Sequence, residues 1–148
     1  MNSFEQLIIG IKQLYELSSE VTKPTEKEDI PDNYVFLLFM IYRKGKVKTT
    51  EISDYFSITP GAATAIADKL ERMEFIARNR DLNDRRIIHI ELTENGLKYV
   101  EQRKKEHITL FQDILQDYSP EELEDAIKTL NQLSESIVSY QQKGGLSK

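Results

Sequence analysis

The sequence contains no cysteine, and only two of its 148 residues are histidine. Without cysteine, the chain has no disulfide scaffold, thiol nucleophile, thiol redox sensor or cysteine-ligated zinc site. Neither His89 nor His107 has a second histidine or carboxylate at a helical spacing typical of a metal site. We therefore expect no metal and no cofactor, and each histidine is expected to be structural or exposed. Paired acid–base residues, a phosphate-cradling glycine loop and a nucleophile with a partner are also missing, so an enzyme is not expected.

The sequence also lacks a long apolar run. The longest one, Tyr34 to Tyr42, is about half the length that a bilayer span requires. Glu5, Lys12 and Glu16 interrupt the region where a signal peptide would need an apolar core. We expect no membrane partner and a cytoplasmic location.

Composition and charge distribution point to a globular chain with one basic region. Hydrophobic residues make up 39% of the chain, too many for a disordered protein and too few for a membrane protein. The net charge of −5 argues against a nucleic-acid partner, but residues 43–86 hold ten basic and seven acidic residues, so the two flanks together carry −8. A basic middle is typical of nucleic-acid binding. The alternative is chance variation among solvated faces.

Two helices are expected before or at the edge of this basic region. Apolar residues from Phe4 to Leu17 recur at spacings of three and four, which predicts an amphipathic helix of about five turns. The polar stretch from Thr22 to Asp29 predicts a connecting loop. A second helix is expected to open at Pro31-Asp32 and continue to Ile41. It is apolar on almost every side, so we expect it to be the buried central helix, with Gly45 ending it at a positive φ.

Two short helices joined by a tight turn are predicted next. Thr49 to Phe56 supplies one apolar face over about two turns. Pro60 to Met73 forms the second helix, with Thr59 as its N-cap and proline at the first helical position. This arrangement indicates a helix-turn-helix, although compact helical domains also contain corners of this kind.

A predicted β-hairpin strengthens that interpretation. Phe75 to Arg78 and Ile87 to Leu92 predict two short strands, and the second alternates between apolar and polar residues. Asn79 to Arg86 forms a polar, charged tip between them. A hairpin in this position corresponds to the wing of a winged helix.

The chain ends with two long amphipathic helices. Thr93 is placed to cap one with apolar positions from Leu97 to Tyr118, and Ser119 is placed to cap the last. The apolar stripes of the terminal helices need another surface to cover them, and a second subunit is the economical one. The alternative is a monomeric bundle in which they pack on their own lobe.

Two motifs resemble the MarR family of winged-helix transcription regulators. The run DRRIIHIELTENG, residues 84–96, is similar to the family's wing signature. The run ITPGAATAIADKLERMEFIAR, residues 58–78, resembles its recognition helix and the entry into the wing. The resemblance covers nearly the whole chain and implies a mostly α fold with a small β-wing. It also implies a sequence-specific DNA-binding regulator, acting as a dimeric repressor on a palindromic operator.

The resemblance further implies how a single domain over residues 1–148 is organised. Residues 31–96 would form the winged-helix DNA-binding lobe, and residues 1–30 and 97–143 would supply the dimerisation helices. Residues 144–148 would form a flexible tail. The partners implied are double-stranded DNA and a second copy of the chain. The alternative function is a protein-interaction module that uses the winged fold without specific DNA binding.

The resemblance places the recognition helix in the major groove, which is wide enough to admit an α-helix. The matching positions are Thr59, Gly61, Ala62, Thr64 and Ala65. None of them is arginine, asparagine or glutamine, so this face lacks the side chains that form two hydrogen bonds with one base. Contacts with thymine methyl groups and readout of DNA shape are expected instead. Ala62 could also pack against the preceding helix, and Lys69 is either a phosphate contact or simply solvated.

The wing is expected to contact the minor groove. By resemblance Arg85 reaches into that groove, where a guanidinium suits the narrow and negative slot of A·T-rich DNA. Asp84 is expected to act as a buttress by pairing with Arg86 or Arg78, because DNA repels an isolated acid. The alternative for any one arginine is a surface ion pair that contributes little. The basic residues taken as DNA-binding candidates on the wing are Arg78, Arg80, Arg85 and Arg86.

Many members of the resembled family bind small aromatic or lipophilic effectors in a cleft between the dimer helices and the winged lobe. The zinc-sensing and thiol-oxidation branches fit this sequence poorly. The candidate pocket residues are Tyr15, Tyr34, Phe36, Phe39, Met40, Phe111 and Tyr118. An aromatic set at helical spacing is also typical of an ordinary core, so both interpretations stay open.

Overall fold

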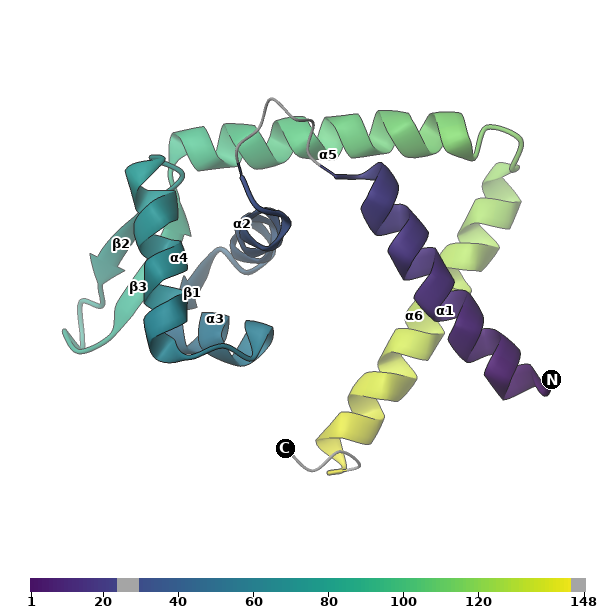
Figure 1. Ribbon diagram of the computed structural model, residues 1–148, viewed down its shortest axis with the longest axis horizontal. Helices are drawn as coiled ribbons and strands as arrows, with labels where there is room; N and C mark the ends of the chain where they lie inside the picture. The colour runs from purple at the N-terminus through teal and green to yellow at the C-terminus, as the bar shows by residue number, and fades with distance from the viewer. Residues whose placement is uncertain (24–29, 145–148) are drawn as a thin grey trace. The chain divides into compact units, whose positions relative to one another are not determined.

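The structure is a computed structural model that describes residues 1–23 and 30–144. In chain order the described elements are α1 (Ser3–Val21), α2 (Asp32–Lys44), β1 (Lys46–Lys48), α3 (Thr49–Phe56), α4 (Pro60–Arg72), β2 (Ile76–Arg80), β3 (Ile88–Leu92), α5 (Glu94–Ile114) and α6 (Pro120–Gln142) (Figure 1). They divide into two compact units, Met1–His107 and Ile108–Lys148. Most of the expected loop, residues 24–29, and most of the expected tail, residues 145–148, lie outside the described residues.

The core of the first unit is built around α2. The buried residues of this helix are Val35, Leu37, Leu38, Met40 and Ile41. The other large, fully buried side chains that complete the core are Val47, Ile52, Leu70, Ile76, Ile90 and Val100. Burying one side chain of this size contributes about 1.5–3 kcal/mol. The predicted buried central helix is therefore confirmed.

Glycine 45 ends α2 as the sequence predicts. Its φ is 83°, a left-handed conformation that glycine adopts without a steric penalty. Its N–H donates to the carbonyl of Ile41 at 2.8 Å, which satisfies one of the free carbonyls at the helix end. Strand β1 begins directly after this turn.

Helices α3 and α4 form the predicted helix-turn-helix. Ser57 takes a left-handed φ of 52° at the end of α3. Thr59 then caps α4, its hydroxyl accepting the N–H of Ala62 at 3.1 Å, and Pro60 occupies the first turn. The side of α4 that faces the core buries Ala63, Ile66, Ala67 and Leu70. Its other side is left exposed.

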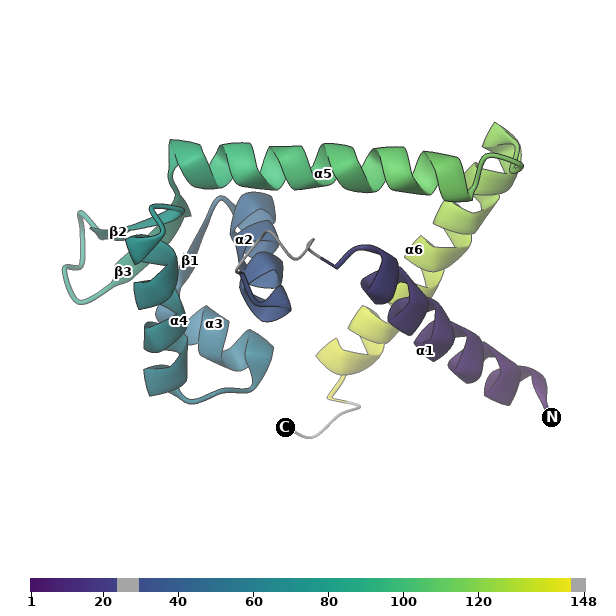
Figure 2. The same cartoon turned by 45° about the horizontal axis from the view of Figure 1, so that its top comes forward.

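The three strands form one antiparallel sheet in the order β1-β3-β2. Ile90 lies on the central strand, directly across from Val47 of β1 and Arg78 of β2. Figures 1 and 2 show α4 beside the β2–β3 hairpin, whose tip points away from α2. The predicted wing is confirmed.

The strands differ from the sequence prediction in three ways, of which the smallest is that β3 begins at Ile88 and not at Ile87. The sequence predicts no strand at β1, because three residues with Val47 as the only apolar one give no visible alternation. Strand β2 begins one residue later than the predicted Phe75–Arg78 and runs two residues further. The backbone of Asn79 and Arg80 still pairs with β3, and this pairing does not require apolar side chains. Because these two residues are polar, the sequence gives no sign that the strand continues through them.

The junction between the sheet and α5 requires glycine at position 96. A Cβ there would clash with the carbonyl oxygen of Phe75, so any other residue must push the backbone apart. The hydroxyl of Thr93 accepts the N–H of Gly96 at 3.0 Å, as expected of the N-cap of this helix. The backbone N–H of Thr93 donates to the carbonyl of Phe75 at 3.1 Å. These contacts tie the start of α5 to the start of β2.

The long helix is shorter than predicted. Helix α5 ends at Ile114, so Tyr118 does not belong to it. Tyr118 lies in the turn before α6, where its N–H donates to the carbonyl of Leu115 at 3.0 Å. Pro120 disfavours a helical conformation in the residue before it, so the chain has to leave the helix ahead of Ser119.

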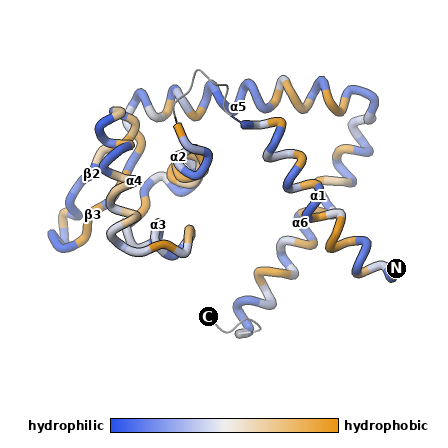
Figure 3. Tube along the Cα trace, viewed as in Figure 1, coloured by the Kyte–Doolittle hydropathy of each residue, from blue (hydrophilic) through white to orange (hydrophobic). Residues whose placement is uncertain are grey.

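Helices α1 and α6 bury none of their residues. Each begins with a capping box, Asn2 with Glu5 in α1 and Ser119 with Glu122 in α6. Figure 3 shows apolar and polar residues alternating along both helices. Within the described part of the chain, no helix is both long and apolar enough to cross a bilayer.

Candidate nucleic-acid interface

The exposed side of α4 carries all five residues that the sequence assigns to the major groove. Thr59, Gly61, Ala62, Thr64 and Ala65 are each exposed. Ala62 therefore does not pack in the core, in contrast to its neighbour Ala63, which is fully buried. The spacing of the core residues turns the small residues outward together.

This surface of α4 is small and uncharged. A Cβ at Gly61 would meet nothing closer than the Thr59 hydroxyl at 4.0 Å. The Thr64 hydroxyl donates to the carbonyl of Pro60 at 2.9 Å, within its own helix. Small side chains let the helix backbone approach another surface closely, and methyl groups suit contacts with thymine methyls.

Lys69 lies further along α4 and is half-buried. Its ammonium group sits 5.3 Å from the centre of the Tyr34 ring on α2, a cation–π geometry. The sequence predicts either a phosphate contact or a solvated side chain for Lys69. The structure shows a third arrangement, in which the Tyr34 ring orients the lysine.

Arg78 points toward α4. Its guanidinium contacts the carboxylate of Asp68 at 2.5 Å and that of Glu71 at 3.8 Å, and its side chain is only 26% exposed. A further hydrogen bond of 3.5 Å runs to the carbonyl of Thr64. Arg78 thus links the wing strand β2 to α4. The sequence signal that could have found this role is the pair of acids three residues apart on α4, which share one helix face.

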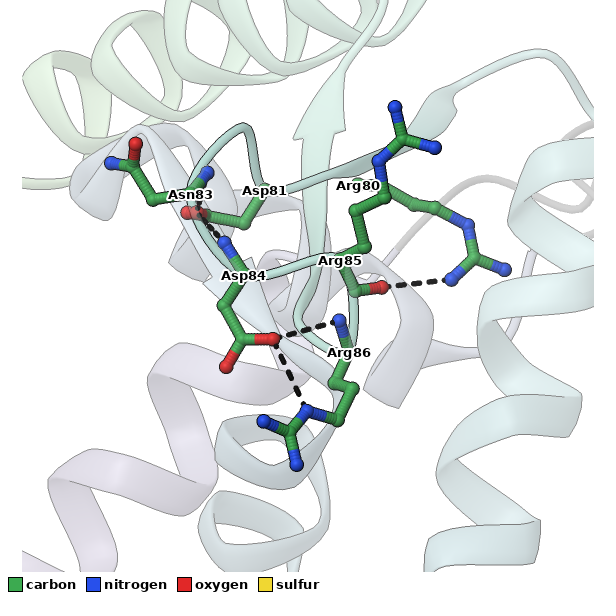
Figure 4. Close-up of polar contacts among 6 residues, drawn as sticks. All are labelled: Arg80, Asp81, Asn83, Asp84, Arg85 and Arg86. Atoms are coloured by element: carbon green, nitrogen blue, oxygen red, sulfur yellow. Dashed lines mark hydrogen bonds and ion pairs between the residues drawn. The ribbon is translucent and has the colours of Figure 1, made fainter.

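The wing tip is held by hydrogen bonds from side chains to the backbone (Figure 4). One carboxylate oxygen of Asp81 accepts the N–H of Asn83 at 2.8 Å and that of Asp84 at 3.0 Å. This is an Asx turn, in which a short acid replaces the backbone carbonyl of an ordinary turn. The guanidinium of Arg80 donates to the carbonyl of Arg85 at 2.8 Å. The tip is therefore shaped by this chain's own side chains.

Asp84 pairs with Arg86, one of the two partners expected for it. Its Oδ1 accepts the backbone N–H of Arg86 at 3.0 Å and the Nε of the same residue at 3.4 Å. Arg78, the other expected partner, is held by the two α4 acids instead. The side chain of Arg86 remains 93% exposed, so its guanidinium faces outward despite this contact.

Asp81 also binds His89, a pair that the sequence did not suggest. The two side chains meet at 2.8 Å between Nε2 and Oδ2. The hydrogen bond from His89, followed by those from the backbone of Asp84 and Asn83, lowers the pKa of Asp81 to about 2. Only the strand register brings residues 81 and 89 together, and the polar composition of β2 hid that register.

A cavity of about 260 Å³ lies in the first unit and includes two of the seven predicted pocket residues, Phe36 and Phe39. His107 stacks on Phe39 with ring centres 5.9 Å apart. Burial, and then the positive charge of Arg103, lowers the pKa of His107. The full lining is Ser19, Thr22, Lys23, Asp32, Val35, Phe36, Phe39, Arg43 and His107.

The other predicted pocket residues do not line this cavity. Met40 is buried in the core, and Tyr34 is packed against the core under Lys69. Tyr15 is exposed on α1. Phe111 and Tyr118 belong to the second unit. Spacing along the helix could not separate the side of α2 that faces the core from the side that faces the cavity, because both sides are apolar.

Comparison with known proteins places these features in a family. The model of the MarR family matches residues 30–88. The HTH-type transcriptional repressor MdtR of Bacillus subtilis is 31% identical over 101 residues, which is 65% of each chain and so just under two thirds of the relative's length. The HTH-type transcriptional regulator YwhA of the same species is 30% identical over 68% of this chain and 72% of its own. These relatives are named as regulators and not as enzymes, in agreement with the sequence expectation.

Solved structures share the fold. A MarR family protein from Bacillus stearothermophilus superposes with a TM-score of 0.75 at 20% identity, covering 93% of this chain and 99% of that one. Streptococcus pneumoniae FabT, solved in complex with DNA, gives a TM-score of 0.69 at 22% identity over the same shares. The sequence motifs, the winged-helix lobe and these matches agree, and the chain belongs to the MarR family.

Proposed function

We propose that this chain is a DNA-binding transcriptional repressor that acts as a homodimer on a palindromic operator. The observation that carries the proposal is the pairing of two surfaces on one lobe. Helix α4 offers a small, exposed face, and the adjacent wing offers exposed arginines on a tip held by hydrogen bonds. FabT, which shares the fold, was solved in complex with DNA.

The two surfaces suit different grooves of the same duplex. Helix α4 would enter the major groove with Thr59, Ala62 and Ala65 towards the base edges. Arg85 and Arg86 would meet the minor groove, whose negative potential attracts guanidinium groups. Arg78 supports this geometry from within, because its contacts with Asp68 and Glu71 join the wing to the helix.

The homodimer is supported by the apolar residues on the terminal helices. On α1, Phe4 is 78% exposed and Leu14 57% exposed; on α6, Ile127 and Ile137 are 57% and 56% exposed. Stripes of this kind on two long helices need a covering surface, and a two-fold dimer buries the same patch on both copies. A palindromic operator has the matching symmetry.

The cavity beside α2 is the proposed site for a small lipophilic or aromatic effector that releases the repressor. Its volume of about 260 Å³ suits a molecule of about one aromatic ring, smaller than a typical drug-sized ligand. Phe36 and Phe39 supply apolar walls, and Lys23, Arg43 and His107 supply polar groups that can orient a ring substituent.

The function is tested by binding of the purified chain to A·T-rich palindromic duplexes and to scrambled duplexes over a salt series. A repressor should prefer the palindrome and lose affinity steeply with salt, because its basic residues release counterions. Arg85→Ala should weaken binding about tenfold and reduce the salt slope by about one. Lys105→Ala, which removes an exposed charge from α5, is the matched control and should change neither.

The result that would contradict the proposal is weak binding without preference for either duplex. A net charge of −5 and the lack of bidentate base-reading side chains on α4 favour one alternative, a protein-interaction module. An apolar protein interface would respond little to salt. The same series therefore separates the two functions.

A further inference from the structure

Leu82 is the most exposed large apolar side chain of the winged-helix lobe, residues 31–96. It is 99% exposed, against 57% for Tyr55, the next in that lobe. The exposed apolar residues of α1 and α6 form long stripes that a second subunit can cover, whereas Leu82 lies among polar residues of the wing tip, residues 81–87. Ile87, the other apolar residue of the tip, is half-buried. No described part of the chain therefore covers Leu82.

The turn around Leu82 does not require a leucine. Leu82 lies at the centre of the Asx turn, in which the carboxylate of Asp81 accepts the backbone N–H groups of Asn83 and Asp84 (Figure 4). Glycine, proline, asparagine, aspartate and serine are the residues ordinarily found in turns. An exposed leucine also adds nothing to the core. Folding of the tip therefore gives no reason for an apolar side chain at this position.

The tip holds the backbone of Leu82 in a defined place. The N–H of Asp81 donates to the carbonyl of Ile87 at 2.9 Å, and the N–H of Ile87 donates to the carbonyl of Asp84 at 3.0 Å. These bonds close the tip across its base, and the hydrogen bond between Asp81 and His89 ties it to the central strand β3. A segment that is ordered before binding loses less conformational entropy on binding. Leu82 is therefore presented to a partner without rearrangement of the backbone.

The surroundings of Leu82 suit a polyanion. Asp81 and Asp84, the two acids of the tip, both accept hydrogen bonds from within the wing. Arg85 is exposed, and the side chain of Arg86 is 93% exposed. One leucine is too small for a protein interface, which has an apolar core within a polar rim. It matches the minor groove better, because that groove attracts arginine and admits apolar side chains that wedge between base steps.

We propose that Leu82 is a specificity-determining residue of the wing, which enters the minor groove beside Arg85 and wedges against a base step. This inference rests on the proposed DNA-binding function. A wedge partly unstacks the step, so the affinity depends on how easily that step unstacks. TA steps unstack readily, whereas A-tracts are stiff and have the narrow groove that attracts arginine. Leu82 therefore favours TA steps, while Arg85 by itself favours A-tracts.

Binding to two duplexes tests this assignment. Both share one palindromic core, selected by the wild-type chain from a random-sequence pool, and have the same base composition. They differ only in the segments that the wings would meet, which are alternating TA steps in one and A-tracts in the other. Wild type should bind the TA duplex about fivefold more tightly. Leu82→Ser should bind the A-tract duplex at least as tightly as the TA duplex.

Two further variants control this comparison. Leu82→Met keeps an apolar side chain at the tip and should retain the preference for TA steps. Arg85→Ala should weaken binding to both duplexes and also keep that preference. Urea unfolding should give the same free energy for wild type and Leu82→Ser, because the side chain is exposed. A lost preference then reports the missing contact with DNA and not a folding defect.

A second measurement reports the unstacking directly. A fluorescent adenine analogue, placed in the TA step, brightens when it loses its stacking neighbours. Saturating wild type should raise its emission, and saturating Leu82→Ser should not. Emission that rises equally with both proteins would overturn the wedge.

The outcomes separate this proposal from the proposed function. Wild type that prefers the palindromic core to a scrambled duplex, but binds the TA and A-tract duplexes as Leu82→Ser does, would overturn the role of Leu82 and leave DNA binding intact. Wild type without preference for the core would overturn both. Unchanged DNA binding by Leu82→Ser, together with lost binding to phosphatidylglycerol vesicles, would assign the leucine to a lipid surface and would also overturn the proposal.

Discussion

Helix α4 and the wing lie side by side in the same lobe, yet their exposed surfaces have opposite chemistry. The exposed side of the N-terminal half of α4 is small and uncharged, with Gly61, Ala62 and Ala65 at its centre. The wing tip carries arginines, and Arg86 is 93% exposed. The difference indicates that the helix contributes steric fit to the DNA and that the wing contributes electrostatic attraction to it. Substitutions in the two elements should therefore change DNA binding in different ways.

The largest effect is expected from filling the α4 face. Ala65→Glu adds both bulk and negative charge where the helix should approach the bases, and should weaken binding to a palindromic duplex about 100-fold. The stability of the fold should not change, because Ala65 is exposed. Equilibrium binding and urea unfolding measure the two quantities. Asn95→Glu, which adds the same charge at the exposed start of α5, is the control, and equal losses in both variants would contradict steric fit.

Removing the charge of the wing should weaken DNA binding less, and should change mainly its dependence on salt. The double variant Arg85→Ala/Arg86→Ala should reduce the salt slope by about two and weaken binding to specific and scrambled duplexes alike. The preference for one palindrome over another should remain, because α4 is intact. A salt series with Lys98→Ala/Lys105→Ala as the control pair checks this. Loss of preference without a change in slope would place sequence readout in the wing.

Arg78 should behave unlike the arginines of the tip. Arg78→Met removes its contacts with Asp68 and Glu71 and should lower the free energy of unfolding by about 1 kcal/mol, as expected of a largely surface ion pair. Arg85→Ala should leave that free energy unchanged. Urea titrations of both variants make the comparison. Equal stability of Arg78→Met and wild type would mean that the contact with α4 does not support the wing.

The smallest effect is the response of the wing to acid. The pKa of Asp81 is lowered from 3.8 to about 2, so the pair stabilises the wing above about pH 4 and loses this contribution as the pH falls towards 2. Amide signals of Asn83 and Asp84 should therefore change in that window, ahead of the signals of α4. Asp81→Asn should remove the transition. Simultaneous loss of wing and helix signals would show that the tip has no separate acid response.

The helices were largely predictable because their signals are local. Thr59 before Pro60, Ser119 before Pro120 and Gly45 after α2 mark helix ends within a few residues of sequence. Capping and left-handed turns depend on neighbouring residues only, so a single sequence contains the information. The exposed face of α4 followed from the same periodicity.

The missed features depend on register and packing between distant segments. The pair of His89 and Asp81 requires the pairing of β2 with β3, and the polar residues of β2 gave no sign that the strand continues to Arg80. The contact of Arg78 with Asp68 requires β2 to pack beside α4, and a strand pattern does not specify that packing. For the cavity, Phe36 and Met40 lie one turn apart on α2, but only Phe36 lines it while Met40 is in the core. A helix that is apolar on almost every side does not reveal which side packs where.

Selection of duplexes from a random-sequence pool by the wild-type chain tests whether a dimer reads DNA through α4 and the wing. We expect enrichment of a palindrome whose two half-sites lie about 10 base pairs apart, centre to centre, with A·T-rich steps where the wings would meet the minor groove. Ala65→Glu should enrich no sequence. A wild-type pool that shows no palindrome, or a single half-site without symmetry, would contradict a dimer that reads DNA through α4 and the wing.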